Sequence, residues 1–175
     1  MKYLFELSKE HKTFPSAEIF CCLKSENIDY KTIEMNKNVL IIETKEDKKI
    51  ENIFSRLSFT FYISKYLFSC STKLDDIKSS AKRIKIKREG SIAIKYKNRS
   101  EKINSQEIVK AVAEVFTKNR KVNLKNPDFE IRTLITDSKV YIGLKLFEVD
   151  RTQFEKRKVQ FRPFFSPISL HPKIA

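Results

Sequence analysis

Glycine is nearly absent from this 175-residue chain, which contains only Gly90 and Gly143. Loops that hold a dinucleotide or a triphosphate need several glycines at fixed spacing, because the backbone must approach the phosphates closely. The sequence therefore disfavours most enzymes that use nucleotide cofactors. Cysteine is also sparse: the three cysteines include the adjacent pair Cys21 and Cys22 and form neither a metal-binding CxxC motif nor an even disulfide framework. This pattern fits a reducing cytoplasm best.

Long apolar runs are missing too. No stretch approaches the roughly eighteen consecutive apolar residues of a membrane span, and the first ten residues are too acidic for a signal peptide. We therefore expect a soluble cytoplasmic protein without a membrane partner. His11 and His171 have no acidic or cysteine cluster near them in the sequence, so we predict no catalytic residue and no metal site in this chain.

The chain is rich in positive charge, and this charge is unevenly distributed. It contains 36 Lys and Arg against 22 Asp and Glu, a net charge of +14. Residues 1–75 hold 12 basic and 11 acidic side chains, a net of +1, whereas residues 76–175 hold 24 and 11, a net of +13. An AT-rich genome enriches lysine throughout its proteins, but this bias would not spare the first 75 residues. The asymmetry favours a polyanionic partner, nucleic acid first, over a surface that is merely well solvated.

Hydrophobic periodicity predicts an α+β fold. Strands are expected near 2–8, 29–35, 38–43 and 59–63, with helices after Thr13 and around Ile50, in the ferredoxin-like order βαββαβ. A second unit follows, with a short helix near Leu74 and a helix that starts at Asn104 with a capping box to Glu107. Its strands are expected at 83–88, 92–96, 129–136 and 139–147. The predicted domains are thus 1–72 and 73–150, followed by a proline-containing linker over 151–175.

Three basic regions, 83–99, 120–125 and 157–162, supply cations that can contact phosphates. In the last region, phenylalanines alternate with arginines; they can stack on unpaired bases, although packing on the neighbouring sheet is the favoured interpretation. The tetrapeptide Asn126–Phe129 is superficially similar to the [DN]PP[YF] motif of methyltransferases. Asp128 replaces its second proline and no glycine-rich loop precedes it, so we assign it no catalysis.

Three segments are distinctive: YLFELSKEHKTFPSAEIFCCL at 3–23, SIAIKYKNRSEKINSQEIVKAVAEVF at 91–116 and VNLKNPDFEIRTLITDSKVYIGLKLF at 122–147. Together they resemble the N-terminal half of archaeal tRNA guanine-N2-methyltransferases, in which a ferredoxin-like domain precedes a THUMP domain. The closing segment RKVQFRPFFSPISLHPKIA at 157–175 is similar to the linker that leads into the catalytic domain of that family.

The resemblance implies tRNA binding. In the family, the THUMP domain grips the acceptor stem and the 3′ end, while a Rossmann-fold domain methylates a guanosine N2 amine with S-adenosylmethionine. No cofactor loop or [DN]PPY motif is present here, so we expect a fragment or a split gene product, with the catalytic domain in cis or as a separate subunit. A helix-start phosphate site is expected near Asn104 and Ser105. The resemblance places RNA contacts at Lys97, Arg99, Lys102, Arg120, Lys121, Lys125, Arg157, Lys158 and Arg162.

Two alternatives stay open. One is a THUMP module or adaptor for a different tRNA modification, such as thiolation, pseudouridylation or acetylation. The opening segment at 3–23 and the closing segment at 157–175 argue against it. The other is a protein-interaction module whose positive face docks an acidic partner. Steep salt dependence of binding and preference for structured RNA would distinguish nucleic acid from an acidic protein.

Overall fold

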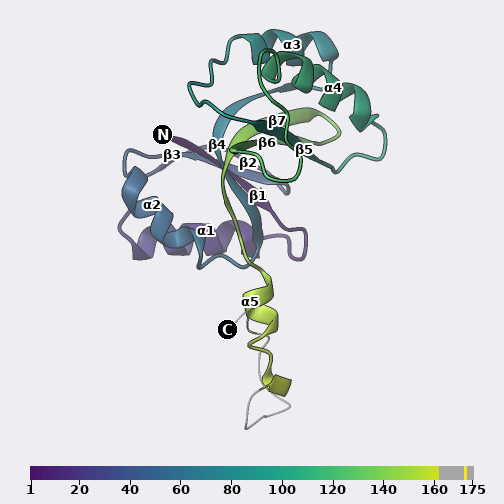
Figure 1. Ribbon diagram of the computed structural model, residues 1–175. Helices are drawn as coiled ribbons and strands as arrows, with labels where there is room; N and C mark the ends of the chain where they lie inside the picture. Colours follow the sequence, from purple (N-terminus) through teal and green to yellow (C-terminus); the bar gives the residue numbers. More distant parts are fainter. Residues whose placement is uncertain (162–171, 173–175) are drawn as a thin grey trace. The chain divides into compact units, whose positions relative to one another are not determined.

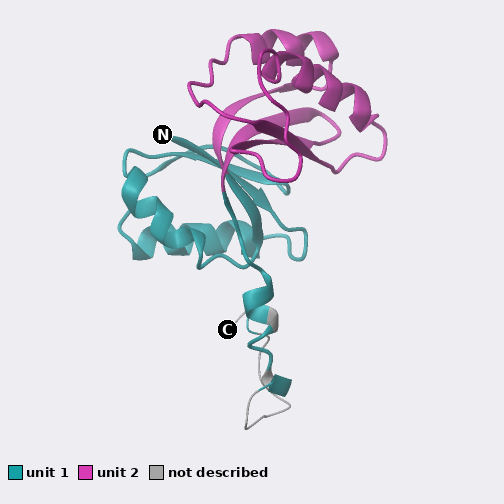
Figure 2. Cartoon of the chain, in the orientation of Figure 1, with its two compact units in different colours: residues 1–63, 147–175 teal, residues 64–146 magenta. Residues whose placement is uncertain are grey.

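The computed structural model describes residues 1–161 and 172, and its helices and strands are labelled in Figure 1. The chain divides into two compact units, which Figure 2 shows in separate colours. The first unit contains residues 1–63 together with the chain from Phe147 onward, and the second contains residues 64–146.

The first unit has the predicted βαββαβ order, and with the second it confirms the α+β class. Its strands lie in the order β2-β3-β1-β4. β1 pairs antiparallel with β3, and β3 pairs antiparallel with β2. The elements are β1 (Lys2–Leu7), α1 (Phe14–Ser25), β2 (Lys31–Met35), β3 (Val39–Glu43), α2 (Asp47–Phe54) and the first part of β4 (Thr60–Ser71).

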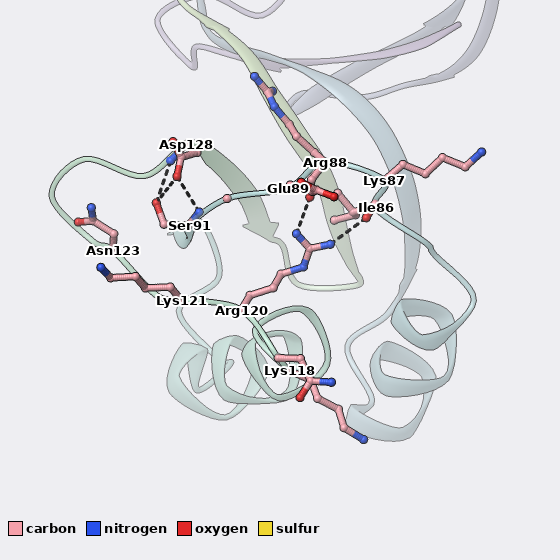
Figure 3. A pocket seen from close by; sticks show the side chains of 12 residues that line it. Ile86, Lys87, Arg88, Glu89, Ser91, Lys118, Arg120, Lys121, Asn123 and Asp128 are labelled. Carbon is pink, nitrogen blue, oxygen red and sulfur yellow. Dashed lines mark hydrogen bonds between the residues drawn. The ribbon is translucent and has the colours of Figure 1, made fainter.

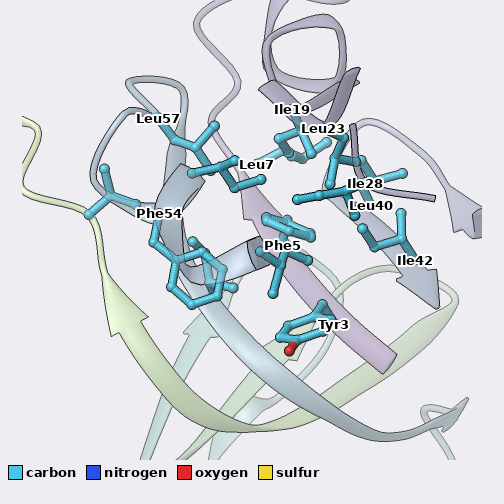
Figure 4. Close-up of a cluster of buried hydrophobic side chains, with 14 residues drawn as sticks. Tyr3, Phe5, Leu7, Ile19, Leu23, Ile28, Leu40, Ile42, Phe54 and Leu57 are labelled. Carbon is cyan, nitrogen blue, oxygen red and sulfur yellow. The ribbon is translucent and has the colours of Figure 1, made fainter. Parts of the chain in front are cut away.

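Alternation along β1 builds the core of this unit. Tyr3, Phe5 and Leu7 are almost fully buried and share a cluster with residues of both helices (Figure 4). Burying a side chain of this size contributes about 1.5–3 kcal/mol, so this face fixes the sheet register against the helices. The same cluster contains Ile19, Leu23, Leu40, Ile42, Ile50, Ile53, Phe54 and Leu57.

α1 begins where the sequence predicts, but a different side chain caps it. Thr13 is the N-cap residue and makes no side-chain cap bond. The Nδ1 atom of His11 instead accepts hydrogen bonds from the backbone N–H groups of Thr13 at 3.2 Å and Phe14 at 3.3 Å. His11 therefore satisfies donors that the first turn of a helix leaves without intrahelical partners.

The second unit contains a sheet with the strand order β4-β7-β6-β5. β5 and β6 are parallel and are joined through α4, whereas β6 and β7 form an antiparallel hairpin. Residues of α3 and α4 share one hydrophobic cluster with residues of the four strands. The bounds are α3 (Leu74–Lys82), β5 (Ile92–Asn98), α4 (Ser105–Phe116), β6 (Phe129–Ile135) and β7 (Lys139–Glu148).

The strand predicted over residues 83–88 is wrong. Residues 84–89 have no regular secondary structure. The alternation that suggested a strand is nevertheless present, because Ile84 and Ile86 pack against the core of the second unit while Lys85 and Lys87 are exposed. Alternation reports which side chains are buried and contains no information about a neighbouring strand. We call residues 84–89 the arm.

The chain returns to the first unit at Phe147, earlier than the linker expected from residue 151. Val149 belongs to the first hydrophobic cluster, and its N–H donates to the carbonyl of Phe61 at 3.0 Å. The Arg151 guanidinium forms an ion pair with Glu10, and its Nε donates to the Ser58 carbonyl at 3.1 Å. The short helices α5 (Thr152–Glu155) and η1 (Val159–Phe161) follow.

Phe154 is buried in the first unit. A buried ring cannot stack on an unpaired base, so of the two interpretations of these phenylalanines Phe154 fits packing within the protein. Phe161 is 66% exposed, and Phe164 and Phe165 lie outside the described residues.

The compact units divide within β4, after Ile63, whereas the predicted domains divide after residue 72. β4 is twelve residues long, and its continuous pattern gives no sequence mark for this division.

Replacing Arg151 by Ala should destabilise the first unit. The change removes an ion pair, a hydrogen bond to a carbonyl and a guanidinium that lies 4.5 Å from the centre of the Phe61 ring. Because the side chain is mostly buried, we expect a loss of about 1–3 kcal/mol in the free energy of unfolding. Urea denaturation followed by circular dichroism measures it. Exposed Lys156→Ala is the control, and equal midpoints for both variants would contradict the role of Arg151.

Candidate nucleic-acid interface

A pocket of about 820 Å³ lies in the second unit, beside the first residues of β5 (Figure 3). Five of its lining residues are cationic and two are acidic, so an anion is the complementary ligand. We call it the basic pocket. Its lining residues are Ile86, Lys87, Arg88, Glu89, Gly90, Ser91, Lys118, Asn119, Arg120, Lys121, Asn123 and Asp128.

Arg120 connects the loop after α4 to the arm. Its Nη1 donates to the carbonyl of Arg88 at 2.5 Å and its Nη2 to the carbonyl of Ile86 at 2.8 Å, as the dashed lines in Figure 3 show. The guanidinium carbon also lies 5.2 Å from the centre of the Phe129 ring. Arg120 was predicted to contact RNA, and the structure shows two of its donors engaged with the protein backbone.

Gly90, Ser91 and Asp128 form the turn at the end of the arm. The Asp128 Oδ2 accepts hydrogen bonds from the Ser91 N–H at 2.7 Å and from the Ser91 hydroxyl at 2.6 Å. These bonds, the hydroxyl one first, lower the pKa of Asp128 below its ordinary value of 3.8. Asp128 thus has a clear structural task, in place of the catalytic one that its tetrapeptide superficially suggests.

The loop after α4 displays two of the predicted RNA contacts. Its carbonyl at Lys121 accepts from the Ile92 N–H at 2.9 Å, so the loop is fastened to the edge of β5. The Asn123 side chain accepts from the backbone N–H groups of Lys125 at 3.2 Å and Asn126 at 3.1 Å, and closes the turn. The Lys121 and Lys125 side chains are exposed.

A second basic group lies at the other end of β5. Lys97 and Lys102 are exposed, and Arg99 is half-buried. The loop after β5 is held by the Asn98 amide, which donates to the Ile103 carbonyl at 3.1 Å, and by the Ser100 hydroxyl, which donates to Asp137 at 2.6 Å. These bonds fix the backbone from which the cations project.

The helix start near Asn104 differs in detail from the prediction. The Asn104 side chain accepts from the N–H of Gln106 at 3.0 Å. A capping box would direct this bond to the N–H of Glu107, three residues after the cap. The predicted phosphate site at Asn104 and Ser105 therefore has one of its N–H donors engaged by the cap.

The structure separates the predicted RNA contacts into groups. Arg120, Lys121 and Lys125 are near the start of β5, and Lys97, Arg99 and Lys102 are near or beyond its end. At about 3.3 Å per residue, β5 separates the two groups by about 20 Å. Arg157 and Lys158 belong to the first unit. Arg162 lies outside the described residues.

Sequence reasoning omitted Lys87, Arg88 and Lys118 from its specific RNA contacts, although they line the basic pocket. The basic run at 83–88 marked the first two as possible phosphate contacts, but its spacing suggested a strand. A further indication was Gly90, one of only two glycines, which has a φ of +107° at the end of the arm. A left-handed turn of this kind favours glycine because it has no Cβ.

Some cations of the second unit are neutralised within the sheet. Glu130 is 7% exposed and forms ion pairs with Lys95 at 3.1 Å, Arg132 at 3.6 Å and Lys145 at 3.7 Å. One carboxylate among three cations offsets part of their charge locally. A count of basic residues alone therefore overstates the positive charge that this unit offers to a ligand.

The described residues do not fit S-adenosylmethionine. The parallel pair β5 and β6 with α4 between them is where a Rossmann-type cofactor would bind, at the turn from strand to helix. That turn, residues 99–104, contains no glycine. Within residues 1–161 and 172, no three His, Cys, Asp or Glu side chains are grouped closely enough to hold a metal ion. No helix in this part of the chain is long and apolar enough to cross a membrane.

The family model for the THUMP domain matches residues 71–145, close to the limits of the second unit. The chain carries a THUMP domain. A tRNA (guanine(10)-N2)-dimethyltransferase of Methanothermobacter thermautotrophicus is 27% identical over 179 residues, covering all of this chain and 52% of that protein. The match falls on the N-terminal part of that enzyme, which confirms the resemblance seen in the sequence. The chain spans about half the length of this relative.

Solved structures share the fold. TrmN from Thermus thermophilus has a TM-score of 0.63 at 12% identity, over 89% of this chain and 49% of that one. A 4-thiouridine synthetase in complex with RNA and ATP has a TM-score of 0.53 at 15% identity, over 85% of this chain and 42% of that one. These likenesses show that the fold of this chain occurs in both proteins.

Replacing Gly90 by Ala should destabilise the second unit. A Cβ at this position would lie 2.8 Å from atoms of the Asp128 side chain, and a φ of +107° is strained for any L residue. We expect a loss of about 1–3 kcal/mol in the free energy of unfolding, measured by urea denaturation. The neighbouring exposed residue supplies the control, Glu89→Ala, which should unfold like the wild type. A Gly90→Ala midpoint equal to that of the control would contradict this account of the turn.

Replacing Ser91 by Ala should raise the pKa of Asp128 toward 3.8, because the change removes the hydroxyl bond and leaves the backbone bond. NMR titration of the Asp128 carboxyl measures this. A lowered folded-state pKa stabilises the fold above the unfolded value of 3.8, and this stabilisation is lost as the pH falls through the lowered pKa of Asp128. Ser79→Ala, at an exposed position of α3, should leave the titration unchanged. An unaltered titration in Ser91→Ala would count against the hydroxyl bond.

Proposed function

We propose that this chain binds tRNA through the basic surface of its THUMP domain and positions it for methylation of a guanosine N2 amine by a separate domain. The observation that carries the proposal is the basic pocket, which gathers five cations on a domain of the THUMP family. Similarity to a tRNA (guanine(10)-N2)-dimethyltransferase over the whole chain supports the choice of tRNA.

Two basic groups about 20 Å apart suit an extended polyanion better than a small anion. A nucleic-acid backbone carries a charge at every nucleotide, so one strand can neutralise cations at both ends of β5. The lysines at both ends are exposed and act as point charges. In this proposal the acceptor stem and its single-stranded 3′ end are the parts of tRNA that the THUMP domain contacts.

The chemistry would come from another domain. In this proposal, residues 1–72 form the ferredoxin-like domain, residues 73–150 the THUMP domain, and residues 151–175 the connection to a Rossmann-fold methyltransferase domain, in cis or as a separate subunit. S-adenosylmethionine would bind there, since the described residues here do not fit it. We place the complex in the cytoplasm, where tRNA is modified.

The fold shared with a 4-thiouridine synthetase favours a second candidate, a THUMP module that serves a different tRNA modification. The two candidates differ in the catalytic domain that the chain assists. A fusion of this chain to the other half of the Methanothermobacter relative, incubated with labelled S-adenosylmethionine and unmodified tRNA, should transfer methyl groups. The 175 residues alone should transfer none, and transfer by them alone would overturn the division of labour.

Salt dependence tests the binding itself. The logarithm of the association constant should fall nearly linearly with the logarithm of salt concentration, by about 0.7–0.9 per neutralised phosphate. Lys121→Gln with Lys125→Gln should therefore reduce the slope by about 1.5, and Lys97→Gln with Lys102→Gln should do the same. Filter binding of tRNA over a salt series gives the slopes.

The matched control is Lys45→Gln with Lys48→Gln, two exposed lysines of the first unit. It removes the same charge and should keep the wild-type slope. A hairpin that mimics the acceptor stem should compete with tRNA, and better with its 3′ overhang than without. Equal slopes for all three double variants would refute the assignment of the binding surface to the THUMP domain.

A further inference from the structure

The arm presents cations without the support of a sheet. Residues 84–89 have no helix or strand, and Ile84 and Ile86 hold the arm to the core by their side chains. Between and after them, Lys85, Lys87 and Arg88 are exposed. These residues also line a second pocket of about 610 Å³ on the same unit, together with Lys65, Leu67 and Leu144. The arm therefore borders two hollows of the surface.

Arg120 supplies the backbone bonds that a neighbouring strand would otherwise supply. Its two terminal nitrogens reach the carbonyls of Ile86 and Arg88, two residues apart on the arm. Alternate carbonyls of an extended segment point the same way, so a planar fork of donors can bind both at once. A lysine has one ammonium group and cannot reproduce this geometry.

The bonded stretch is fixed at Arg120 and at the turn that follows it. Arg120 lies against Phe129, the first residue of β6, which restricts the guanidinium. Beyond the arm, the turn at Gly90 is closed by the bonds between Ser91 and Asp128. The carbonyls of Ile86 and Arg88 therefore have defined positions, and the side chains of Lys87 and Arg88 start from a fixed backbone at the basic pocket.

We propose that Arg120 is a positioning residue for RNA binding, which holds the arm so that Lys87 and Arg88 meet the RNA backbone, and does not itself neutralise a phosphate. This inference rests on the proposed function and changes the role that the sequence assigned to Arg120. Its effect on binding passes through the arm. Loss of Arg120 should therefore cause no additional loss once the arm cations are gone.

A double-mutant cycle on salt slopes tests this. The arm variant, Lys87→Gln with Arg88→Gln, should reduce the slope for tRNA binding by about 1.5. Adding Arg120→Gln to the arm variant should reduce it no further. Adding Lys121→Gln instead should reduce it by about another 0.7–0.9, because Lys121 contacts phosphate directly in the proposed function. A further reduction of that size with Arg120→Gln would overturn the positioning role.

The conservative change gives an independent readout. Arg120→Lys keeps the charge and loses the fork, so its tRNA affinity should stay close to that of Arg120→Gln. A direct phosphate contact predicts the reverse, because lysine serves well as a point charge. Recovery of wild-type affinity by Arg120→Lys would therefore refute the proposal. Circular dichroism of each variant verifies that the domain is folded.

A last measurement needs no RNA and separates this inference from the proposed function. Limited digestion with trypsin, with the cut sites identified by mass spectrometry, reports how often the arm opens. Arg120→Gln should increase cleavage after Lys85, Lys87 and Arg88 severalfold over the wild type, whereas Lys121→Gln should not. If the chain fails to bind tRNA but shows this increase, the proposed function is wrong, whereas Arg120 still holds the arm. Unchanged cleavage of the arm in Arg120→Gln would refute the role of Arg120 in holding the arm.

Discussion

The two hydrogen bonds from Arg120 to the carbonyls of Ile86 and Arg88 hold together a surface whose charges oppose its assembly. Lys87, Arg88, Lys118 and Lys121 line the same pocket, and their mutual repulsion disfavours the compact arrangement. The Arg120 guanidinium bonds to backbone carbonyls, so it stabilises the arm without a carboxylate partner. The pocket can thus remain strongly positive and yet keep a defined shape.

A comparison with the sheet shows the opposite arrangement. There, the nearly buried Glu130 is within ion-pair distance of Lys95, Arg132 and Lys145, and their charges are offset inside the protein. The basic pocket has two acids, Glu89 and Asp128, and the Oδ2 atom of Asp128 accepts both hydrogen bonds from Ser91. In the sheet a carboxylate thus gathers the cations, whereas at the arm backbone carbonyls accept the hydrogen bonds of Arg120.

Much of the fold follows from periodicity. The alternation of Tyr3, Phe5 and Leu7 and the helical spacing of Ile50, Ile53 and Phe54 identify elements that the structure contains, because burial of one face dictates both patterns. The predictions that failed share one cause, which is dependence on residues distant in the sequence. Alternation over 83–88 indicates which side chains are buried but cannot show a missing partner strand. After the return to the first unit at Phe147, Val149 and Arg151 contact residues that are far away in the sequence, and no local pattern records such contacts.

The candidate site was predictable in composition and less so in geometry. A basic second half and the run around Arg120 are visible in the sequence, but the acceptors of Arg120 are 32 and 34 residues away. Contacts between residues so far apart in the sequence depend on the tertiary fold, because α4 must first pack on the sheet to bring the loop after it beside the arm. The sequence therefore places Arg120 in one set of phosphate contacts with Lys121 and Lys125. The structure distinguishes a cation that supports the surface from those that form it.

The separation of the two basic groups bears on which polyanion is suitable. An acidic patch on a protein is usually compact and of irregular shape, whereas a nucleic-acid strand places charges at regular intervals over tens of ångströms. β5 spans about 20 Å from the basic pocket at its start to its end, near which Lys97 and Lys102 lie. A ligand that engages both groups must itself be extended and charged throughout. The rigid spacing of cations at the two ends of one strand, more than the total charge, is what favours RNA over an acidic protein.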